Sequence, residues 1–320
     1  MHKILGVNGD GLYIALYTLG KTELARVNLS DGTLEKLFED TTISDTEHSF
    51  SMTEKYFTYF AKGEEGDFRV VVYDTESKEK KEFPLEDEVI DYPKMSPVYF
   101  PECNKIYFSY MHDVVIDVKT GKTETITLGD GWKGTKTVVA APDGSGFIVS
   151  DDNTIRSISL SGDTKFTQVC PGASVKCISF YKNKKGKTES IVVLYNNGTV
   201  YRYSYTDGSF MGGINSSIFQ ISDEYSKMDF DYDTHTLYIQ SGNVTQVIDT
   251  DSWIETACFN SSFGYFAPRD IFLTYSLIND HKYKIGYYKH YTVEDLKKKA
   301  EDQLGGAEMS DEKKSEYGLE

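Results

Sequence analysis

The chain has 320 residues, with 34 Lys and Arg against 50 Asp and Glu, so its formal net charge is −16 and its isoelectric point is about 4.9. A surface this acidic repels phosphate groups, which argues against a nucleic-acid partner. No apolar run approaches the roughly 18 residues that a membrane span requires. No signal peptide precedes the first strand pattern, so we expect a cytoplasmic protein with no membrane partner.

The four cysteines are consistent with this location. Cys103, Cys170, Cys177 and Cys258 show no C-x-x-C spacing and no regular framework. A small secreted domain would pair its cysteines, so we interpret these as free thiols of a reducing compartment.

A short motif occurs six times along the chain. Each copy is an alternating apolar run, a Gly/Asp/Ser/Thr turn and a second alternating run, which is the pattern of a β-hairpin. The copies begin at residues 27, 72, 116, 158, 203 and 247, so the steps are 45, 44, 42, 45 and 44 residues. A period of about 44 residues in a strand-rich chain predicts an all-β fold, a β-propeller with one four-stranded blade per repeat.

An earlier hairpin with a polar tip precedes each copy of the motif. The tip of the fifth unit is lengthened by the lysine-rich run Lys182–Lys187 (KNKKGK). This run and Lys78–Lys81 (KEKK) fall where turns are expected, so we interpret both as solvated turns.

A seventh unit begins at Tyr265, and its strand pattern stops at Tyr291. We therefore predict a seven-bladed propeller over residues 1–291 and a helical tail over residues 292–320 that packs on it. The tail has a helix start at Thr292 and a helix end at Gly305-Gly306. One strand is missing from the seventh blade: it comes from residues upstream of Met1 in a longer chain, or the tail covers the edge, or the blade has three strands.

The motif resembles the end of a WD repeat. Tyr73-Asp74, Ile116-Asp117 and Ile248-Asp249 stand at the place of the Trp-Asp dipeptide, and Ala141–Gly144 (APDG) matches the turn between the first two strands. The resemblance covers residues 2–291 and implies a WD-like propeller, although no unit has Trp-Asp or the Gly-His pair.

The tail resembles the segment that closes propellers attached to bacterial STAND-type signalling NTPases. The residues that carry this resemblance are Leu296, Ala300, Leu304, Gly305, Met309, Ser310, Asp311, Glu312, Lys313 and Tyr317. It implies that the chain or its close relatives serve as the C-terminal sensor of a bacterial signalling or defence protein, with an effector domain upstream.

Motifs of cofactor and metal sites are incomplete. Ala15–Thr22 (ALYTLGKT) has apolar residues where a phosphate loop needs glycines. The run Asp229-x-Asp231-x-Asp233 lacks the Gly and the Glu of a calcium loop, so we interpret it as a polar tip. The six histidines are scattered. We predict no cofactor, metal or catalytic residue.

Trp132 lies in the glycine-flanked loop Gly129–Gly134 between the third and fourth blades. An exposed Trp beside a cation is a good binding anchor, so we predict that Asp130, Trp132 and Lys133 contact a partner. The alternative is that Trp132 packs between the blades.

These features predict a non-catalytic recognition module for a protein, a peptide or a small effector. The alternative is a metal-dependent propeller hydrolase or lactonase with acidic ligands in the central channel. The first strands are rich in Ser, Val, Tyr and Phe, which argues against that alternative.

Overall fold

The computed structural model describes most of the chain and divides it into two compact units, residues 1–260 and 261–320. We describe each unit by itself. The described residues are 2–8, 10–18, 21–41, 50–62, 67–85, 95–110, 112–129, 132, 134–215, 226–241, 244–260, 262–266, 271–279, 282–289, 291, 295, 298, 299, 302, 310 and 311.

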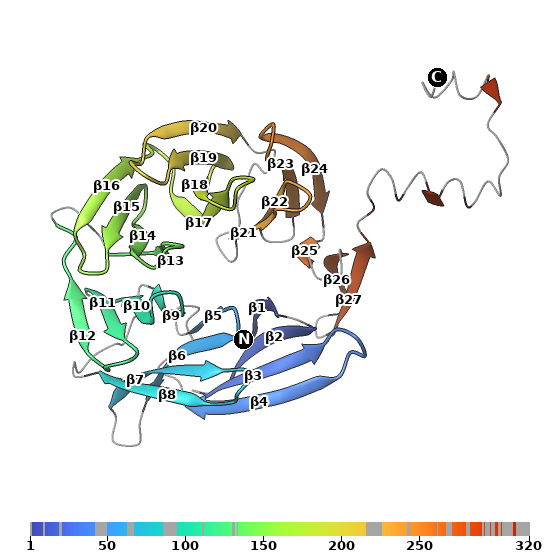
Figure 1. Cartoon of the computed structure of the whole chain (residues 1–320). Coiled ribbons are helices and arrows are strands. Elements are labelled where there is room, and N and C mark those ends of the chain that lie inside the picture. The colour runs from blue at the N-terminus through green and yellow to red at the C-terminus, as the bar shows by residue number, and fades with distance from the viewer. Residues whose placement is uncertain are drawn as a thin grey trace. The chain divides into compact units, whose positions relative to one another are not determined.

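The first unit contains six antiparallel sheets, which we call blades one to six (Figure 1). Each blade has four strands paired in chain order. Blades one to three are formed by β1 (His2–Asn8), β2 (Gly11–Thr18), β3 (Lys21–Asn28), β4 (Leu34–Thr41); β5 (Phe50–Thr53), β6 (Tyr56–Lys62), β7 (Phe68–Asp74), β8 (Lys80–Leu85); β9 (Met95–Phe100), β10 (Lys105–Ser109), β11 (Asp113–Asp117) and β12 (Thr123–Ile126). Blades four to six are formed by β13 (Thr137–Ala140), β14 (Gly146–Ser150), β15 (Thr154–Ser159), β16 (Thr164–Val169); β17 (Val175–Lys182), β18 (Thr188–Tyr195), β19 (Thr199–Ser204), β20 (Phe210–Asn215); β21 (Ser226–Asp231), β22 (Thr236–Ser241), β23 (Val244–Asp249) and β24 (Ile254–Asn260).

The second unit holds the seventh blade and the tail. Its sheet has three strands, β25 (Ser262–Phe266), β26 (Ile271–Asn279) and β27 (Lys282–Lys289). Helical residues follow at Asp295, Lys298, Lys299, Asp302 and Asp311. The predicted all-β, seven-bladed propeller with a helical tail is confirmed, and in the described residues the seventh blade has three strands. That the tail packs on the propeller stays a prediction. No helix in the described part of the chain is long and apolar enough to cross a membrane.

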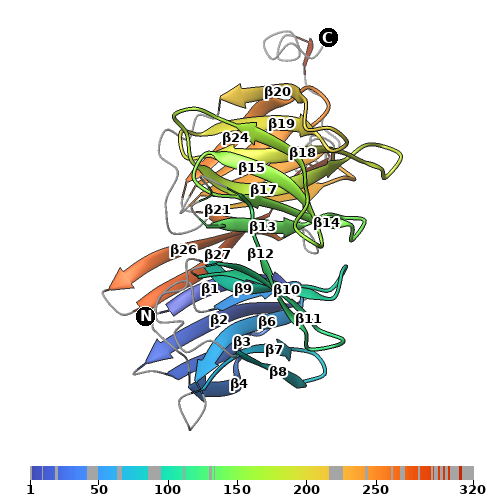
Figure 2. The same ribbon diagram turned by 90° about the vertical axis from the view of Figure 1, so that its left-hand side faces the viewer.

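The core of the first unit consists of five apolar clusters, each shared by two successive blades. Figure 2 shows the strands of these blades from a second side. Alternate side chains of one strand enter different clusters. On β18, Ile191 and Val193 pack against blade four, whereas Val192 and Leu194 pack against blade six. The second strand of a blade is therefore buried on both faces, which explains why it reads as a continuous apolar run.

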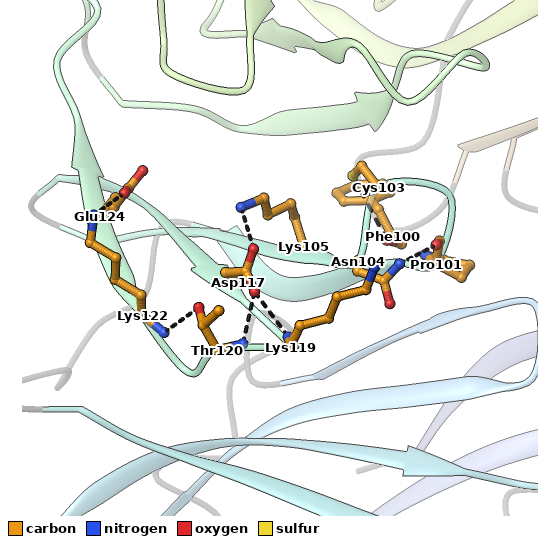
Figure 3. A network of polar contacts seen from close by, with 10 residues as sticks. All are labelled: Phe100, Pro101, Cys103, Asn104, Lys105, Asp117, Lys119, Thr120, Lys122 and Glu124. Atoms are coloured by element: carbon orange, nitrogen blue, oxygen red, sulfur yellow. Dashed lines mark hydrogen bonds and ion pairs between the residues drawn. The ribbon is translucent and has the colours of Figure 1, made fainter.

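The predicted repeat motif is the turn between the third and fourth strands. In blade three, the Asp117 carboxylate accepts hydrogen bonds from the backbone N–H of Lys119 and of Thr120, at 3.0 and 2.9 Å (Figure 3). Lys105, at the start of the second strand, donates to the same carboxylate at 2.8 Å. The Lys105 ammonium and these N–H groups hold the pKa of Asp117 well below its usual range. The aspartate of the motif thus closes the turn and ties it to the neighbouring hairpin.

Five of these turns place a residue with positive φ at the same point. Gly32, Gly121 and Gly208 have φ of 74°, 72° and 75°, and the other two residues are Lys78 with φ of 63° and Trp253 with φ of 55°. The three glycines and Lys78 donate the backbone N–H to the residue four positions earlier, as Gly121 does to Asp117 at 2.8 Å. Glycine is favoured there because a side chain is strained in the left-handed region.

We predict that Gly121→Ala lowers the free energy of unfolding by about 1 kcal/mol. A Cβ at this position would meet no atom within 4 Å, so the loss reports backbone strain alone. Lys119→Ala, in the same turn, is the control and should change stability by less than about 0.5 kcal/mol. Equal denaturation midpoints for the two variants would contradict the assignment.

Candidate functional site

Trp132 lies between blades three and four, in contact with both. Its indole packs against the apolar cluster that these blades share, and its Nε1–H donates to Asp113 Oδ2 at 3.0 Å. The backbone N–H of Thr135 donates to the other oxygen of Asp113 at 3.1 Å. The Arg156 guanidinium stacks on the indole, with Cζ 4.7 Å from the ring centroid. Asp113, at the start of β11, therefore holds Trp132 and Thr135, which lie in the connection between blades three and four.

The structure thus gives Trp132 the packing role that the sequence analysis held as the alternative. Asp113 is 4% exposed, so the indole N–H satisfies a buried carboxylate. Asp130 and Lys133 lie outside the described residues. Their contact with a partner, and that of Trp132, stays a prediction.

A cleft of about 480 Å³ lies at the other end of the sheets, between blades five and six. Antiparallel pairing brings the first–second and third–fourth turns of a blade to the same end. One wall is the tip at residues 182–187, and the other comprises the tip at residues 232–235 and the buried Thr250. We call this space the blade five–six cleft.

Both tips are ordered by their own hydrogen bonds. The Asn183 side-chain oxygen accepts from the backbone N–H of Lys185 and of Lys187, at 3.0 and 3.2 Å. In the opposite tip, Asp231 Oδ1 accepts from the N–H of Asp233 and of Thr234. The cleft walls are therefore held in place before any ligand arrives, and Asp231 uses this oxygen in its own turn.

Four aromatic side chains pack together in and beside the cleft: Tyr181, Phe230, Tyr232 and Trp253. Tyr181 contacts Trp253 edge-on, with ring centroids 5.5 Å apart, and Phe230 stacks on Tyr232 at 5.7 Å. Tyr232 is 42% exposed, and its hydroxyl donates to the Phe180 carbonyl of blade five at 3.0 Å. Burial raises the pKa of Tyr232, which keeps the hydroxyl protonated for this bond. An exposed ring is thereby fixed across two blades.

Trp253 adopts a conformation that is rare for its type. Its φ is 55°, at the position where three other turns have glycine and one has Lys78. Strain of this kind persists only where the surroundings enforce it, and it concentrates at functional sites. Here the Arg202 guanidinium stacks on the indole, with Cζ 4.1 Å from the centroid. Burial lowers the pKa of Arg202, as expected for a guanidinium partly removed from water.

The charges at the cleft are partly paired. Asp251 joins the two walls, because Lys184 Nζ lies 3.3 Å from Oδ2 and His235 Nδ1 lies 3.4 Å from Oδ1. Arg202 and Lys182 form no ion pair within 4 Å with a described carboxylate. Lys182 lines the cleft, and Arg202 lies beside it on the ring of Trp253.

The corresponding space between blades two and three is almost filled. Its volume is about 100 Å³, and Tyr56 and Tyr99 meet edge-on there at 4.8 Å. Lys55 also pairs with Asp74 at 3.1 Å. Five residues separate the first two strands of blade five, against two in blade two, and this longer tip extends the wall of the blade five–six cleft.

In the sequence, both walls of the cleft have the pattern of ordinary polar turns, and both were predicted as such. The signals that could have located the site were the lengthened KNKKGK tip and a Trp at the glycine position of the last motif copy. Within the described residues, no group of three His, Cys, Asp or Glu side chains could hold a metal ion.

Comparison with known proteins identifies the fold. No protein-family model matches the chain, and no curated protein matches it in sequence. In structure it is similar to Sqt1 of Saccharomyces cerevisiae, a WD40 propeller, with a TM-score of 0.60 and 14% identity over 88% of this chain and 80% of that one. In all, 1308 solved chains match. An architecture so widely shared leaves the function to be argued from the site.

We predict that Trp132→Phe lowers the free energy of unfolding by about 1 to 3 kcal/mol, because Asp113 loses a donor while the packing is largely kept. Denaturation in urea measures the change. Phe210→Leu, at a side chain that is 60% exposed, is the control and should be nearly neutral. Wild-type stability of Trp132→Phe would refute the packing role and leave the indole free for a partner.

Proposed function

We propose that the protein is a non-catalytic recognition module that binds an extended segment of a protein partner in the blade five–six cleft. The observation that carries this proposal is the exposed, fixed ring of Tyr232, which packs on Tyr181. Tyr181 also contacts Trp253, on which Arg202 stacks. Tyr, Trp and Arg are the residue types that dominate binding energy at protein interfaces.

The chemistry of the cleft indicates what the segment carries. The aromatic group offers a surface for an apolar or aromatic side chain. Arg202 and Lys182 attract a carboxylate, and a guanidinium can bind one through two parallel hydrogen bonds. The ligand is therefore an apolar residue next to an acidic one.

Pre-organisation supports affinity at this site. Tyr232 is tied to Phe180, and both tips are closed by internal hydrogen bonds. Fewer side chains then lose freedom when the partner binds, so less of the contact energy is cancelled.

The cellular role that we propose is that of the sensor part of a bacterial signalling or defence system, in the cytoplasm. The resemblance of the tail to the closing segment of STAND-linked propellers supports the role. Free thiols at all four cysteines support a reducing compartment. In this role, binding in the cleft relieves restraint on an effector domain upstream.

We expect an antibody against this chain to detect, in source cells, a polypeptide far larger than 36.2 kDa. The excess mass would be the effector domain. A single band at 36.2 kDa would contradict the effector in cis and leave the cleft proposal intact.

We expect that peptides selected from a random display library for binding to the wild-type protein contain an acidic residue next to an apolar one. Tyr232→Ala and Arg202→Lys should each weaken their binding about tenfold or more, because each removes an anchor. Titration calorimetry with one selected peptide measures the effect. Phe210→Ala, an exposed aromatic on β20, is the matched control and should bind as the wild type does. Equal affinity for all four proteins would refute the cleft as the site.

A further inference from the structure

Among the described strands, the third strand of the seventh blade is its last. In blades one to six the third strand lies between the second and the fourth. In the described part of the second unit, β27 pairs with β26 alone. No described strand pairs with the backbone N–H and C=O groups of its other edge, and an open edge of this kind is the arrangement that accepts an added strand.

The side chains at the end of β27 are also uncovered. Tyr287 is 68% exposed and Tyr288 is 63% exposed. Successive residues of a strand point to opposite faces, so both faces of the sheet are open at this point. The third strands of blades two and three are largely buried. An added strand would cover part of both tyrosine rings.

The charge of β27 indicates what would pair with it. The strand carries Lys282, Lys284 and Lys289 and no acidic residue. In blades one and two, cations on the third strand pair with carboxylates on the fourth. These pairs are Lys21–Glu39 at 2.9 Å, Arg26–Glu35 at 4.0 Å and Arg69–Glu82 at 3.2 Å. By the same pairing rule, a strand beside β27 would be acidic.

A second copy of the chain does not meet this requirement. Pairing β27 with β27 would bring lysines beside lysines, and like charges on adjacent strands are unfavourable. The net charge of −16 adds repulsion between copies. An acidic segment of a different polypeptide meets this requirement.

We infer that β27 takes an extended acidic segment of a partner polypeptide as the fourth strand of the seventh blade. Backbone hydrogen bonds would supply affinity, and the lysines would select acidic sequences. This site is separate from the blade five–six cleft, and neither inference depends on the other.

The test is amide hydrogen exchange, resolved by residue, on the full chain. The probe is a peptide of residues 33–42 (TLEKLFEDTT), which spans β4, an acidic fourth strand of this chain. The control is the same peptide with Glu35→Lys, Glu39→Lys and Asp40→Lys. We expect about every second amide of β27 to exchange fast in the free monomer and to be protected by the acidic peptide. The control peptide should bind about tenfold more weakly.

The complementary test reverses the charge of β27 in the protein. Lys284→Glu combined with Lys289→Glu should reverse the preference, so that the lysine-bearing peptide binds better than the acidic one. An unchanged preference, or no protection by either peptide, would overturn the inference. Slow exchange throughout β27 in the free monomer would overturn it as well, because the chain itself would then cover the edge. Protection that depends on protein concentration would replace the partner with a second copy.

Discussion

Burial of the second strand of each blade on both faces is the constraint on which the rest of this structure depends. Each such strand sends alternate side chains into the clusters on its two sides, as Ile191 and Val192 do on β18. Because each blade shares its core with its neighbours, no single sheet is stable alone. This coupling fixes the spacing of the blades, and the turns at their ends project from a rigid base. Function can then reside in those turns without disturbing the fold.

The blade five–six cleft shows how this arrangement yields a site. Between blades two and three, the ring pair of Tyr56 and Tyr99 and an ion pair nearly fill the space at the turn ends. Between blades five and six, a longer tip extends one wall, and aromatic side chains cover the floor without closing it. The conformation of Trp253 belongs to the same feature, because its ring is held between Tyr181 and Arg202. A local departure from the repeat therefore produces an open, ordered and partly charged surface.

The repeat could be predicted from the sequence because its signal is local. An aspartate that accepts backbone N–H groups two and three residues later, as Asp117 does, requires only a short motif. The cleft could not be predicted in the same way, since its walls come from two repeats about 50 residues apart and show their relation only when the blades pack. Trp132 illustrates the converse. Its flanking glycines indicate an accessible loop, but its hydrogen-bond partner Asp113 is 19 residues earlier and becomes visible only in the fold. The three-stranded seventh blade was one of three alternatives in the sequence, because a strand pattern cannot show which chain supplies its neighbour.

Site-specific photocrosslinking tests the central claim, that the partner is recognised at the blade five–six cleft, most directly. A benzophenone amino acid would replace Tyr232 in one protein and Lys133, in the loop between blades three and four, in another. Both proteins would be irradiated in an extract of the source cells, and the adducts would be identified by mass spectrometry. We expect one dominant adduct from position 232 and none from position 133. The adduct from position 232 should be lost when Arg202→Lys is added to that protein. An adduct from position 133 and none from position 232 would contradict the claim and return recognition to the loop of Trp132.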